Sequence, residues 1–475
     1  MNLPIIQLPV LVSEYGPYFE SLFTAGEYGQ FQRYLSGLLT SDNKTVEGIN
    51  RLFIQPSQCQ SSLNRFLTES SYDIQEVNQR RVAWLQECPA TGFKKGPPAR
   101  RGVLVIDDTL LEHVGKHFEH IARLYGHSKE RYVQAHNLVT LHYSDDGVDY
   151  PLYFQLWKPP QVDLLEQALE ASGVRIRPKE RLLKGTAPSK WRAHLVRLAN
   201  KNQDKEAVRQ VFRSKLSIAQ ELLLALCHAY PDTDMPVVFD SWYTAPWFCR
   251  WLGRELGKAY VGTLKPDEEV FREANQFCRL DDFAEQLKAQ HLAKPQERVF
   301  VPTTIYYKGK QETYYAYTHM HSIRSFGRHR LVINYRKADL SDKPAFFICN
   351  RPKWDAGAIT RIRRHRWPVE VYHEEGKAEG LDKYQVRGFE AIHKHIAFTA
   401  LAYSMLQRAR FDASLVAKLQ GELDHEIQGS LAFWRRAMQA HALMAILAWV
   451  SQAVIQGDSY APLWGAMVKA IAYPG

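Results

Sequence analysis

The chain has 475 residues, of which 45% are hydrophobic and 24% are charged. This composition excludes a mostly disordered chain, a collagen-like chain and a small disulfide scaffold, and the length fits about three domains or one domain with large additions. Lys and Arg number 61 against 51 Asp and Glu, so the net charge of +10 favours an anionic partner: nucleic acid, an acidic membrane surface or an acidic protein.

The first part of the chain, residues 1–93, is predicted to be a helical domain because apolar residues recur at helical spacing. Two short helices, at 45–53 and 57–67, flank a break, and Ser57 is a plausible N-cap of the second. They form either a helix-turn-helix or a plain helical hairpin. In the first case the residues close to DNA would be Ser61, Ser62, Asn64 and Arg65.

An α/β pattern follows a linker at 94–101. The apolar run 103–106 is typical of a buried strand and ends at Asp107. Strands at 133–143 and 148–157 are predicted to form a hairpin. The elements predicted next are a helix over 206–230, a strand over 236–239 that ends at Asp240, a helix over 245–256 and a strand over 259–264.

The rest of the chain is predicted to be β-rich and then helical. Strands are expected at 300–307, 313–317, 331–335 and 345–349, and helices over 355–379 and most of 391–475. We therefore divide the chain into a helical domain at 1–93, a core at 102–264 that resumes at 351–400, a β-rich insertion at 265–350 and a C-terminal helical region at 401–475.

Positive charge is concentrated in three places. Residues 175–215 hold thirteen Lys or Arg and three acids, so this segment alone accounts for the net charge of +10. The other two clusters are Lys94, Lys95, Arg100 and Arg101, and Arg361, Arg363, Arg364 and Arg366. Each alone reads equally well as solvated surface. Three together favour a polyanion that is held along its length, because phosphate neutralisation adds over many contacts.

Three acids could form a metal site. Asp107 and Asp240 follow predicted strands, and functional groups collect at strand ends in open α/β sheets. Glu370 lies on the predicted helix after Arg366, with Lys377 two turns further on. Carboxylate oxygens are the ligands that Mg²⁺ prefers, and two such ions about 4 Å apart activate a nucleophile and stabilise the leaving oxygen in phosphodiester chemistry.

These residues carry a resemblance to a known family. Over roughly 103–400 the chain resembles the DDE transposases of bacterial insertion sequences. The matching motifs are the apolar strand followed by Asp-x-Thr at 103–109, the second strand and acid at 237–243, and a Y-x2-R-x3-E-x6-K signature at Arg366, Glu370 and Lys377. Arg363 stands where the signature has tyrosine, a departure that leaves one phosphate-contacting hydroxyl without a counterpart.

The resemblance implies a fold, a site and an activity. The fold would be α/β, an RNase H-like catalytic core with the β-rich insertion before the catalytic Glu, flanked by a helical N-terminal domain and C-terminal helices. Asp107, Asp240 and Glu370 would hold two Mg²⁺ ions, with Mn²⁺ as a substitute. The residues expected to contact DNA are Arg361, Arg363, Arg364, Arg366 and Lys377.

The implied reaction is cut-and-paste transposition. A homodimer would bind the terminal inverted repeats in double-stranded DNA, cleave at the end of the element, and join the freed 3′-OH to target DNA. The Asp-x-Thr spacing selects Asp107 as the first acid over Asp108, which points to the opposite face if the strand continues. The alternatives are a transposase-derived DNA-binding regulator and a structure-specific nuclease.

The expected location is the bacterial cytoplasm, in association with the nucleoid. Six scattered cysteines without a CxxC pair are typical of reduced thiols in a cytosolic protein. The first residues lack the charged start and apolar core of a signal peptide. The most apolar run, 442–450, is shorter than the roughly 20 residues that a membrane helix needs, so no membrane partner is expected.

Overall fold

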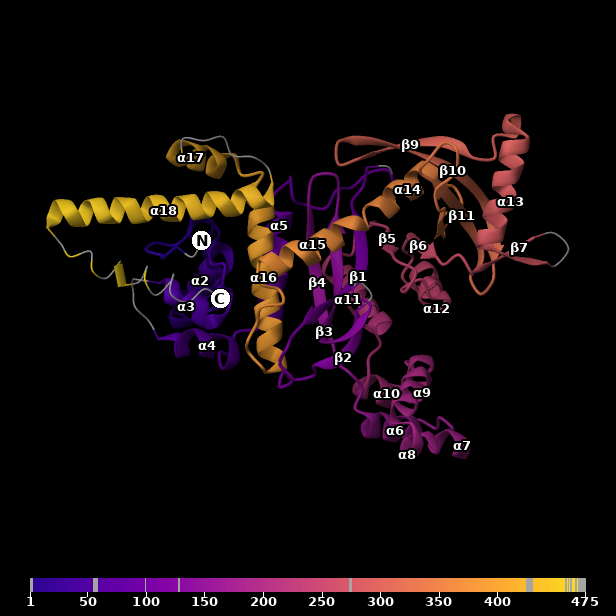
Figure 1. Cartoon of the computed structure of the whole chain (residues 1–475), viewed down its shortest axis with the longest axis horizontal. Helices are drawn as coiled ribbons and strands as arrows, with labels where there is room; N and C mark the ends of the chain where they lie inside the picture. The colour runs from indigo at the N-terminus through magenta and orange to yellow at the C-terminus, as the bar shows by residue number, and fades with distance from the viewer. Residues whose placement is uncertain are drawn as a thin grey trace.

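The computed structural model describes residues 3–53, 59–98, 100–126, 129–272, 276–423 and 430–457, and the single positions 459, 461, 464, 465 and 468. Within this part of the chain the strands form one twelve-stranded mixed sheet with helices packed around it (Figure 1). The mixed α/β class predicted from the sequence is confirmed at this level.

The N-terminal segment is helical, as predicted. Its elements are α1 (Val10–Tyr15), the 3₁₀ helix η1 (Gly16–Leu22), α2 (Ala25–Thr40), α3 (Val46–Leu52), α4 (Gln60–Thr68) and α5 (Ile74–Gln86). Thr24 and Glu27 start α2 with a capping box, which satisfies backbone N–H groups at the helix start. Ser57, the predicted N-cap, lies outside the described residues. The helix-turn-helix interpretation of α3 and α4 stays a prediction.

The first half of the sheet contains the predicted hairpin. Its strands are β1 (Val103–Glu112), β2 (Ala122–Gly126), β3 (Arg131–Ser144), β4 (Asp149–Trp157), β5 (Val237–Phe239) and β6 (Tyr260–Leu264). β3 runs antiparallel to β1 and β4 antiparallel to β3, whereas β5 and β6 run parallel to β1. The order across these strands is β4-β3-β1-β5-β6, so β1 and β5 are central neighbours.

β1 is longer than the sequence predicted. It does not end at Asp107 but pairs with β3 as far as Glu112, opposite Ala135. Aspartates are poor strand formers, and the fourteen-residue partner strand overrides the preference of Asp107 and Asp108 by pairing with them. Asp107 and Asp108 therefore lie within a strand, where consecutive side chains point to opposite faces.

A lobe of short helices interrupts the core between β4 and α11 (Lys215–Ala229), and the sequence analysis did not predict it. It contains α6 (Val162–Ala171), α7 (Pro178–Arg181), α8 (Leu183–Thr186), α9 (Pro188–Lys201) and α10 (Glu206–Val211), and we call residues 162–211 the helical lobe. The lobe projects from the sheet (Figure 1) and has its own apolar core around Leu165, Trp191 and Leu195. The single helix predicted over 206–230 is in fact α10 and α11.

The β-rich segment continues the central sheet. After α12 (Pro246–Arg250) and the π-helix η3 (Trp251–Glu255), the chain forms β7 (Glu269–Phe271), β8 (Phe277–Arg279), α13 (Leu280–Ala293), the 3₁₀ helix η5 (Pro295–Glu297), β9 (Val301–Tyr307), β10 (Lys310–Ile323), β11 (Gly327–Tyr335) and β12 (Ala345–Cys349). Because β12 pairs antiparallel with β6, the strands of 265–350 extend the sheet rather than form a separate one.

Two helices then return to the sheet: α14 (Ala356–Arg364) and α15 (Trp367–Ala378). Ile359, Ile362 and Val369 from these helices pack with Val103 and Val105 of β1. The alternate residues of β1 join the larger core that includes α11. This alternation places α15 against the strand that carries Asp107.

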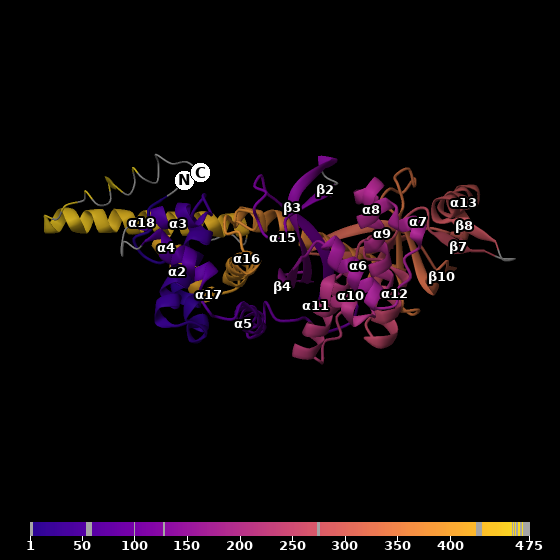
Figure 2. The same ribbon diagram turned by 90° about the horizontal axis from the view of Figure 1, so that it is seen from below.

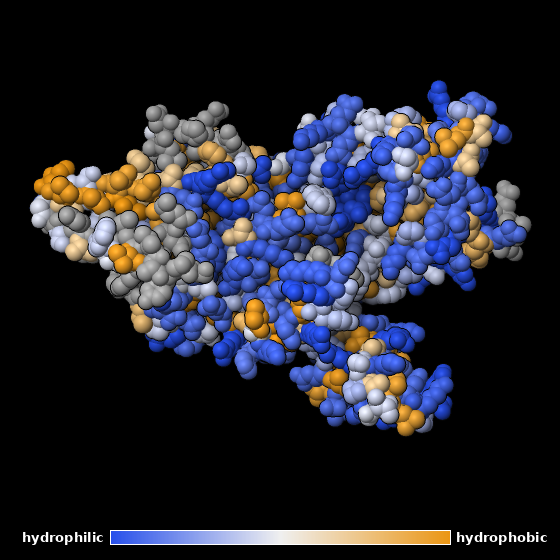
Figure 3. Space-filling model, in the orientation of Figure 1, coloured by the Kyte–Doolittle hydropathy of each residue, from blue (hydrophilic) through white to orange (hydrophobic). Residues whose placement is uncertain are grey.

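The C-terminal helices are α16 (Phe389–Ala409), α17 (Ala413–Leu423) and α18 (Leu431–Gln456). Among the described residues α18 alone has the length and composition of a membrane span, with 26 residues and a hydropathy of 1.4 over its best window. Its first turns are buried, at Trp434 and Met438, whereas Leu447 and Ile455 are exposed. Figure 3 shows hydrophobic residues gathered on the part of the surface where α18 projects. Core helices pass the same test, so this alone is weak evidence for a membrane span.

Candidate active site

Asp107 and Glu370, far apart in the sequence, meet through one arginine. Arg366 precedes α15, and one of its terminal nitrogens donates to Asp107 Oδ2 at 2.9 Å. The other terminal nitrogen donates to Glu370 Oε1. The structure thus brings together the first acid, the third acid and an arginine of the predicted signature.

Asp240 lies beside this pair because of the strand register. Ile106 of β1 pairs with Phe239 of β5, and the acids are the next residue on each strand. Asp240 Oδ1 accepts hydrogen bonds from the backbone N–H groups of Trp242 and Tyr243, at 3.0 and 3.2 Å, which fixes the turn after β5. Its negative charge acts on Asp107. All three predicted acids therefore gather at one place.

The Asp107 carboxylate lacks sufficient positive charge for its degree of burial. Burial raises the pKa of Asp107 to about 7, Arg366 opposes that rise, and the charges of Asp108 and Asp240 add to it. A carboxyl group with a pKa this far above its ordinary value is typical of functional sites, where acids are held together at a cost to stability.

Asp108 has a different environment from Asp107. Its Oδ1 accepts a hydrogen bond from the Tyr243 hydroxyl at 2.9 Å. Its Oδ2 accepts from Asn137 Nδ2 at 2.6 Å and from Lys215 Nζ at 2.7 Å. Three donors hold this carboxylate on the face of β1 away from Glu370. This geometry favours Asp107 as the first acid and gives Asp108 an anchoring role.

The predicted DNA-contacting arginines have different environments. Arg363 is half-buried, donates to Thr263 Oγ1 at 2.8 Å and lies over the Phe347 ring. Burial lowers its pKa to about 10, and the three acids oppose that shift, so it belongs to the cluster. Arg364 instead pairs with Glu312 of β10 at 3.0 Å.

Arg361 does not reach this site, contrary to the prediction that it contacts DNA. Its side chain is 3% exposed and donates to Asp146 Oδ2 at 2.7 Å. It also donates to the backbone carbonyl of Arg101 in the linker at 3.2 Å. Arg361 therefore ties α14 to the β3–β4 turn and the linker. Lys377 lies further along α15, where its charge acts on the pKa of buried His373.

A cavity of about 340 Å³ opens beside the acids and is basic. Arg363, Arg364 and Arg366 line it, together with residues that the sequence analysis missed: Arg336, Lys343 and Trp367. Trp367 directly follows Arg366 and is 53% exposed, and this pairing of an aromatic with the signature arginine was the available signal. The arrangement can hold a phosphate next to the carboxylates.

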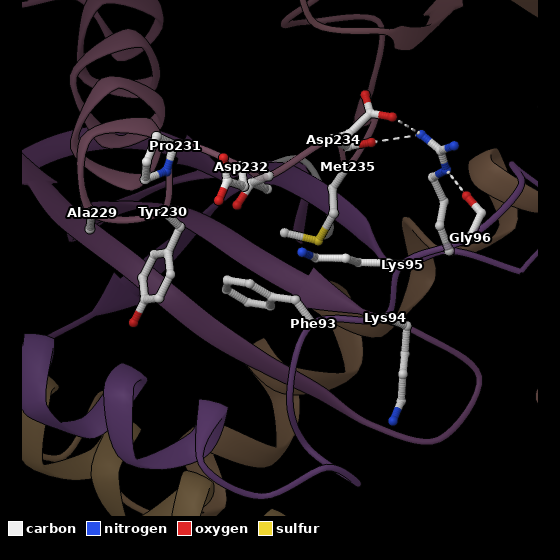
Figure 4. Close-up of a pocket in the computed structure, with 12 residues that line it drawn as sticks. Phe93, Lys94, Lys95, Gly96, Ala229, Tyr230, Pro231, Asp232, Asp234 and Met235 are labelled. Carbon is white, nitrogen blue, oxygen red and sulfur yellow. Dashed lines mark hydrogen bonds and ion pairs between the residues drawn. The ribbon is translucent and has the colours of Figure 1, made fainter.

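A second cavity, of about 510 Å³, lies at the other end of the central strands. It is lined by the linker around Lys95 and by the segment up to Met235, just before β5 (Figure 4). Arg101 pairs there with Asp234 at 2.6 Å. Functional sites in open α/β sheets form at the carboxyl ends of parallel strands, which favours the acid cluster over this cavity.

The residues of the acid cluster fit a hard divalent cation in donor type. Three carboxylates supply oxygen ligands, and the raised pKa of Asp107 signals unbalanced negative charge. Among the described residues no group of three or more acids, histidines or cysteines is arranged to hold a metal ion. At the acid cluster the guanidinium of Arg366 pairs with both Asp107 and Glu370. A cation at these oxygens would have to displace it.

Comparison with known proteins gives the family of this chain. A family model described as "DDE superfamily endonuclease" matches residues 17–282, more than half of the chain. The chain belongs to this family. The matched span of this DDE endonuclease includes Asp107 and Asp240 and ends before Glu370. No curated protein sequence matches it.

The solved structures similar to this chain include a piggyBac transposase synaptic complex with hairpin DNA determined by cryo-electron microscopy. The TM-score is 0.41 at 10% sequence identity, over 95% of this chain and 78% of that one. A likeness at this level carries no argument about function.

Replacing Asp108 should cost stability. Asp108→Asn removes the charge that Lys215 neutralises and weakens the acceptor for Tyr243 and Asn137, so we expect the free energy of unfolding to fall by about 1–3 kcal/mol. Urea unfolding of the purified protein measures this. An unchanged midpoint and slope would contradict the anchoring role.

Replacing Asp107 should instead raise the stability of the folded protein, and the gain should depend on pH. Its carboxyl ionises at ordinary pH in the unfolded chain but only near pH 7 in the folded one, so the wild type loses stability as pH rises from about 4 to 7, by up to about 1.4 kcal/mol per pH unit. Asp107→Asn lacks this loss. In EDTA, its Tm relative to wild type should therefore be higher at pH 8 than at pH 5, and a pH-independent difference would contradict the raised pKa.

Proposed function

We propose that this DDE endonuclease is the transposase of a bacterial insertion sequence. In this proposal it binds the terminal inverted repeats of the element in double-stranded DNA and catalyses Mg²⁺-dependent strand cleavage and strand transfer. The observation that carries the proposal is the meeting of Asp107, Asp240 and Glu370 beside a basic cavity. Acids alone occur in many enzymes, whereas acids next to several arginines suit a scissile phosphate.

The topology supports an RNase H-like core and the Y-R-E-K branch. An antiparallel meander of β1, β3 and β4 is joined to the parallel strands β5 and β6, with the first acid on β1 and the second after β5. Residues 265–350 lie between the second acid and the helix that carries Glu370. This is the position that the resemblance assigns to the β-rich insertion.

Asp107, Asp240 and Glu370 would hold two Mg²⁺ ions, or Mn²⁺ in their place. When bound, the metal supplies an activated nucleophile and stabilises the leaving oxygen at the phosphodiester. The chain's own contribution is positioning: Arg366, released from the two carboxylates, turns its guanidinium to a DNA phosphate, and Arg363 holds the neighbouring one. Planar guanidinium groups suit this task because they match phosphate oxygens in pairs.

We also propose a homodimer that acts in the bacterial cytoplasm, on the nucleoid. The exposed apolar part of α18, around Leu447 and Ile455, supports an association of two copies, because burying it would remove apolar surface from water.

Loss of any one acid should abolish cutting and spare binding. With a labelled duplex that carries the element's own terminus, we expect cleavage in Mg²⁺ and none in EDTA. Glu370→Ala, Asp107→Ala and Asp240→Ala should each cut at least about 10²–10³-fold more slowly, because each removes an oxygen ligand beside the reacting phosphate. A gel shift on the same duplex measures the retained binding.

The matched control is Glu374→Ala, since Glu374 is an exposed carboxylate one turn further along α15. It should cut like the wild type. Binding of the terminus without metal-dependent cutting by the wild type would favour the regulator. Cutting without preference for the terminus would favour a structure-specific nuclease.

Arg366 and a divalent ion should compete for the same oxygens. Arg366→Ala removes the competing guanidinium, so we expect Mn²⁺ to bind the DNA-free protein about tenfold more tightly, equivalent to about 1.4 kcal/mol. The same variant should cleave DNA more slowly, because it lacks the phosphate contact. Calorimetric titration measures the first effect. An unchanged Mn²⁺ affinity would contradict the competition.

A further inference from the structure

A large groove lies between the helical lobe and the body of the protein. It has a volume of about 1,090 Å³ and is lined on one side by α9 and α10 and on the other by α11, α12 and η3. Seen from below in Figure 2, α9 and α10 lie beside α11 and α12. We call this the lobe groove. It is separate from the cavity that Arg366 and Trp367 line.

The lobe groove combines cations with aromatic rings. Four cations, Arg197, Lys201, Arg209 and Arg250, and three acids, Asp204, Glu221 and Glu255, line it. Arg209 pairs with Glu206, and Glu221 pairs with Arg213 outside the lining, so the cations without an ion pair among the described residues are Arg197, Lys201 and Arg250. Trp247 and Trp251 line the opposite wall, and Trp247 is 36% exposed. Basic grooves with interleaved aromatic rings are typical of surfaces that bind nucleic acid.

The sequence of α9 explains why it presents cations to the groove. Trp191, Leu195 and Ala199 recur every four residues and are buried in the lobe's own core. Arg197 and Lys201 fall on another face of the same helix, line the groove and are exposed. Among the ion pairs between described residues none involves these two cations or Arg250, an exposed cation on the opposite wall. The nearby cations Arg181 and Lys184, in contrast, pair with acids of α6.

The helical lobe is connected to the sheet near the end of the strands that carries the acid cluster. It leaves the sheet after Trp157, which aligns through β3 with Leu110, three residues beyond Asp107. It returns at Lys215, which donates to Asp108 and lies 4.8 Å from the ring centre of Trp242, two residues after Asp240. The lobe therefore joins the sheet at the same end of the central strands as the acid cluster.

We propose that the lobe groove binds the sugar-phosphate backbone of the substrate duplex beyond the cleavage site. This inference rests on the DNA-cleaving function proposed above. The fourteen residues of α9 extend about 21 Å, and a duplex of that length carries about twelve phosphate charges. The segment 175–215, which carries the whole net charge of the chain, supplies the neutralising cations. Trp247 packs against the strand from the opposite wall.

The test compares two triple variants. Arg197→Gln, Lys201→Gln and Arg250→Gln together remove three expected phosphate contacts of the groove, whereas Arg197→Lys, Lys201→Arg and Arg250→Lys keep the charges. Kd is measured from about 50 to 200 mM salt for a short duplex limited to the cleavage site and for a long duplex extended beyond it. The logarithm of the association constant falls with the logarithm of the salt concentration by about 0.9 per phosphate contact. On the long duplex this fall should therefore be less steep for the neutral variant than for the wild type, by about 2–3 in slope.

On the short duplex the change in slope should be smaller, and the charge-conserving variant should match the wild type on both. Hydroxyl-radical footprinting of the long duplex should show protection beyond the cleavage site that the neutral variant loses. Circular dichroism and thermal melting check that both variants fold, since all three side chains are exposed.

Each other outcome has a definite meaning. An unchanged slope and footprint in the neutral variant would overturn the proposal. A loss confined to single-stranded DNA of the same length would assign the groove to a single strand and overturn the duplex assignment. Failure of the wild type to bind either duplex would overturn the proposed function itself, and this inference with it.

Discussion

The active-site geometry depends on the ion pairs that Arg366 makes with Asp107 and Glu370. Strand pairing places Asp107 and Asp240 next to each other, and packing of α15 adds a third carboxylate. Buried negative charges repel one another unless a cation neutralises them. In this structure the cation is a side chain of the protein. The arginine therefore holds α15 against β1 while it keeps the acids assembled for a metal ion to take over.

The two adjacent aspartates of β1 have different roles because consecutive side chains of a strand point to opposite faces. Asp107 faces the acid cluster, where burial leaves it with too little positive charge. Asp108 faces the other way and receives three donors, one of them from Tyr243 beyond Asp240. That hydrogen bond ties β1 to the turn that positions Asp240. The unfavourable burial of charge at Asp107 thus lies next to a carboxylate whose hydrogen bonds are satisfied, as is usual where a functional site lowers stability locally.

Local patterns in the sequence were enough to predict the central strands at 103–106 and 236–239 and the acids that follow them, because both apolar runs are short and rich in valine, which favours a buried strand over a buried helix. They were not enough to predict that β1 continues past Asp107, since the polar residues there are held by β3 and not by their own preference. The helical lobe was missed because its apolar stripe of Trp191, Leu195 and Ala199 is embedded in a strongly basic stretch. Arg361 and Arg366 look equivalent in sequence, and only tertiary packing buries one and turns the other to the acids.

The residues that would take part in the reaction and the residues that would bind the rest of the substrate lie in different parts of the molecule. Around the acids, Arg363, Arg364 and Arg366 are largely balanced by carboxylates, whereas the excess of positive charge lies in the segment 175–215. Interactions that hold substrate and transition state equally tighten binding without raising the rate of the chemical step. Cations placed outside the reacting centre can therefore be numerous and permanent. Those inside must be few and able to move, because Arg366 has to release its carboxylates before the same oxygens can bind a metal ion.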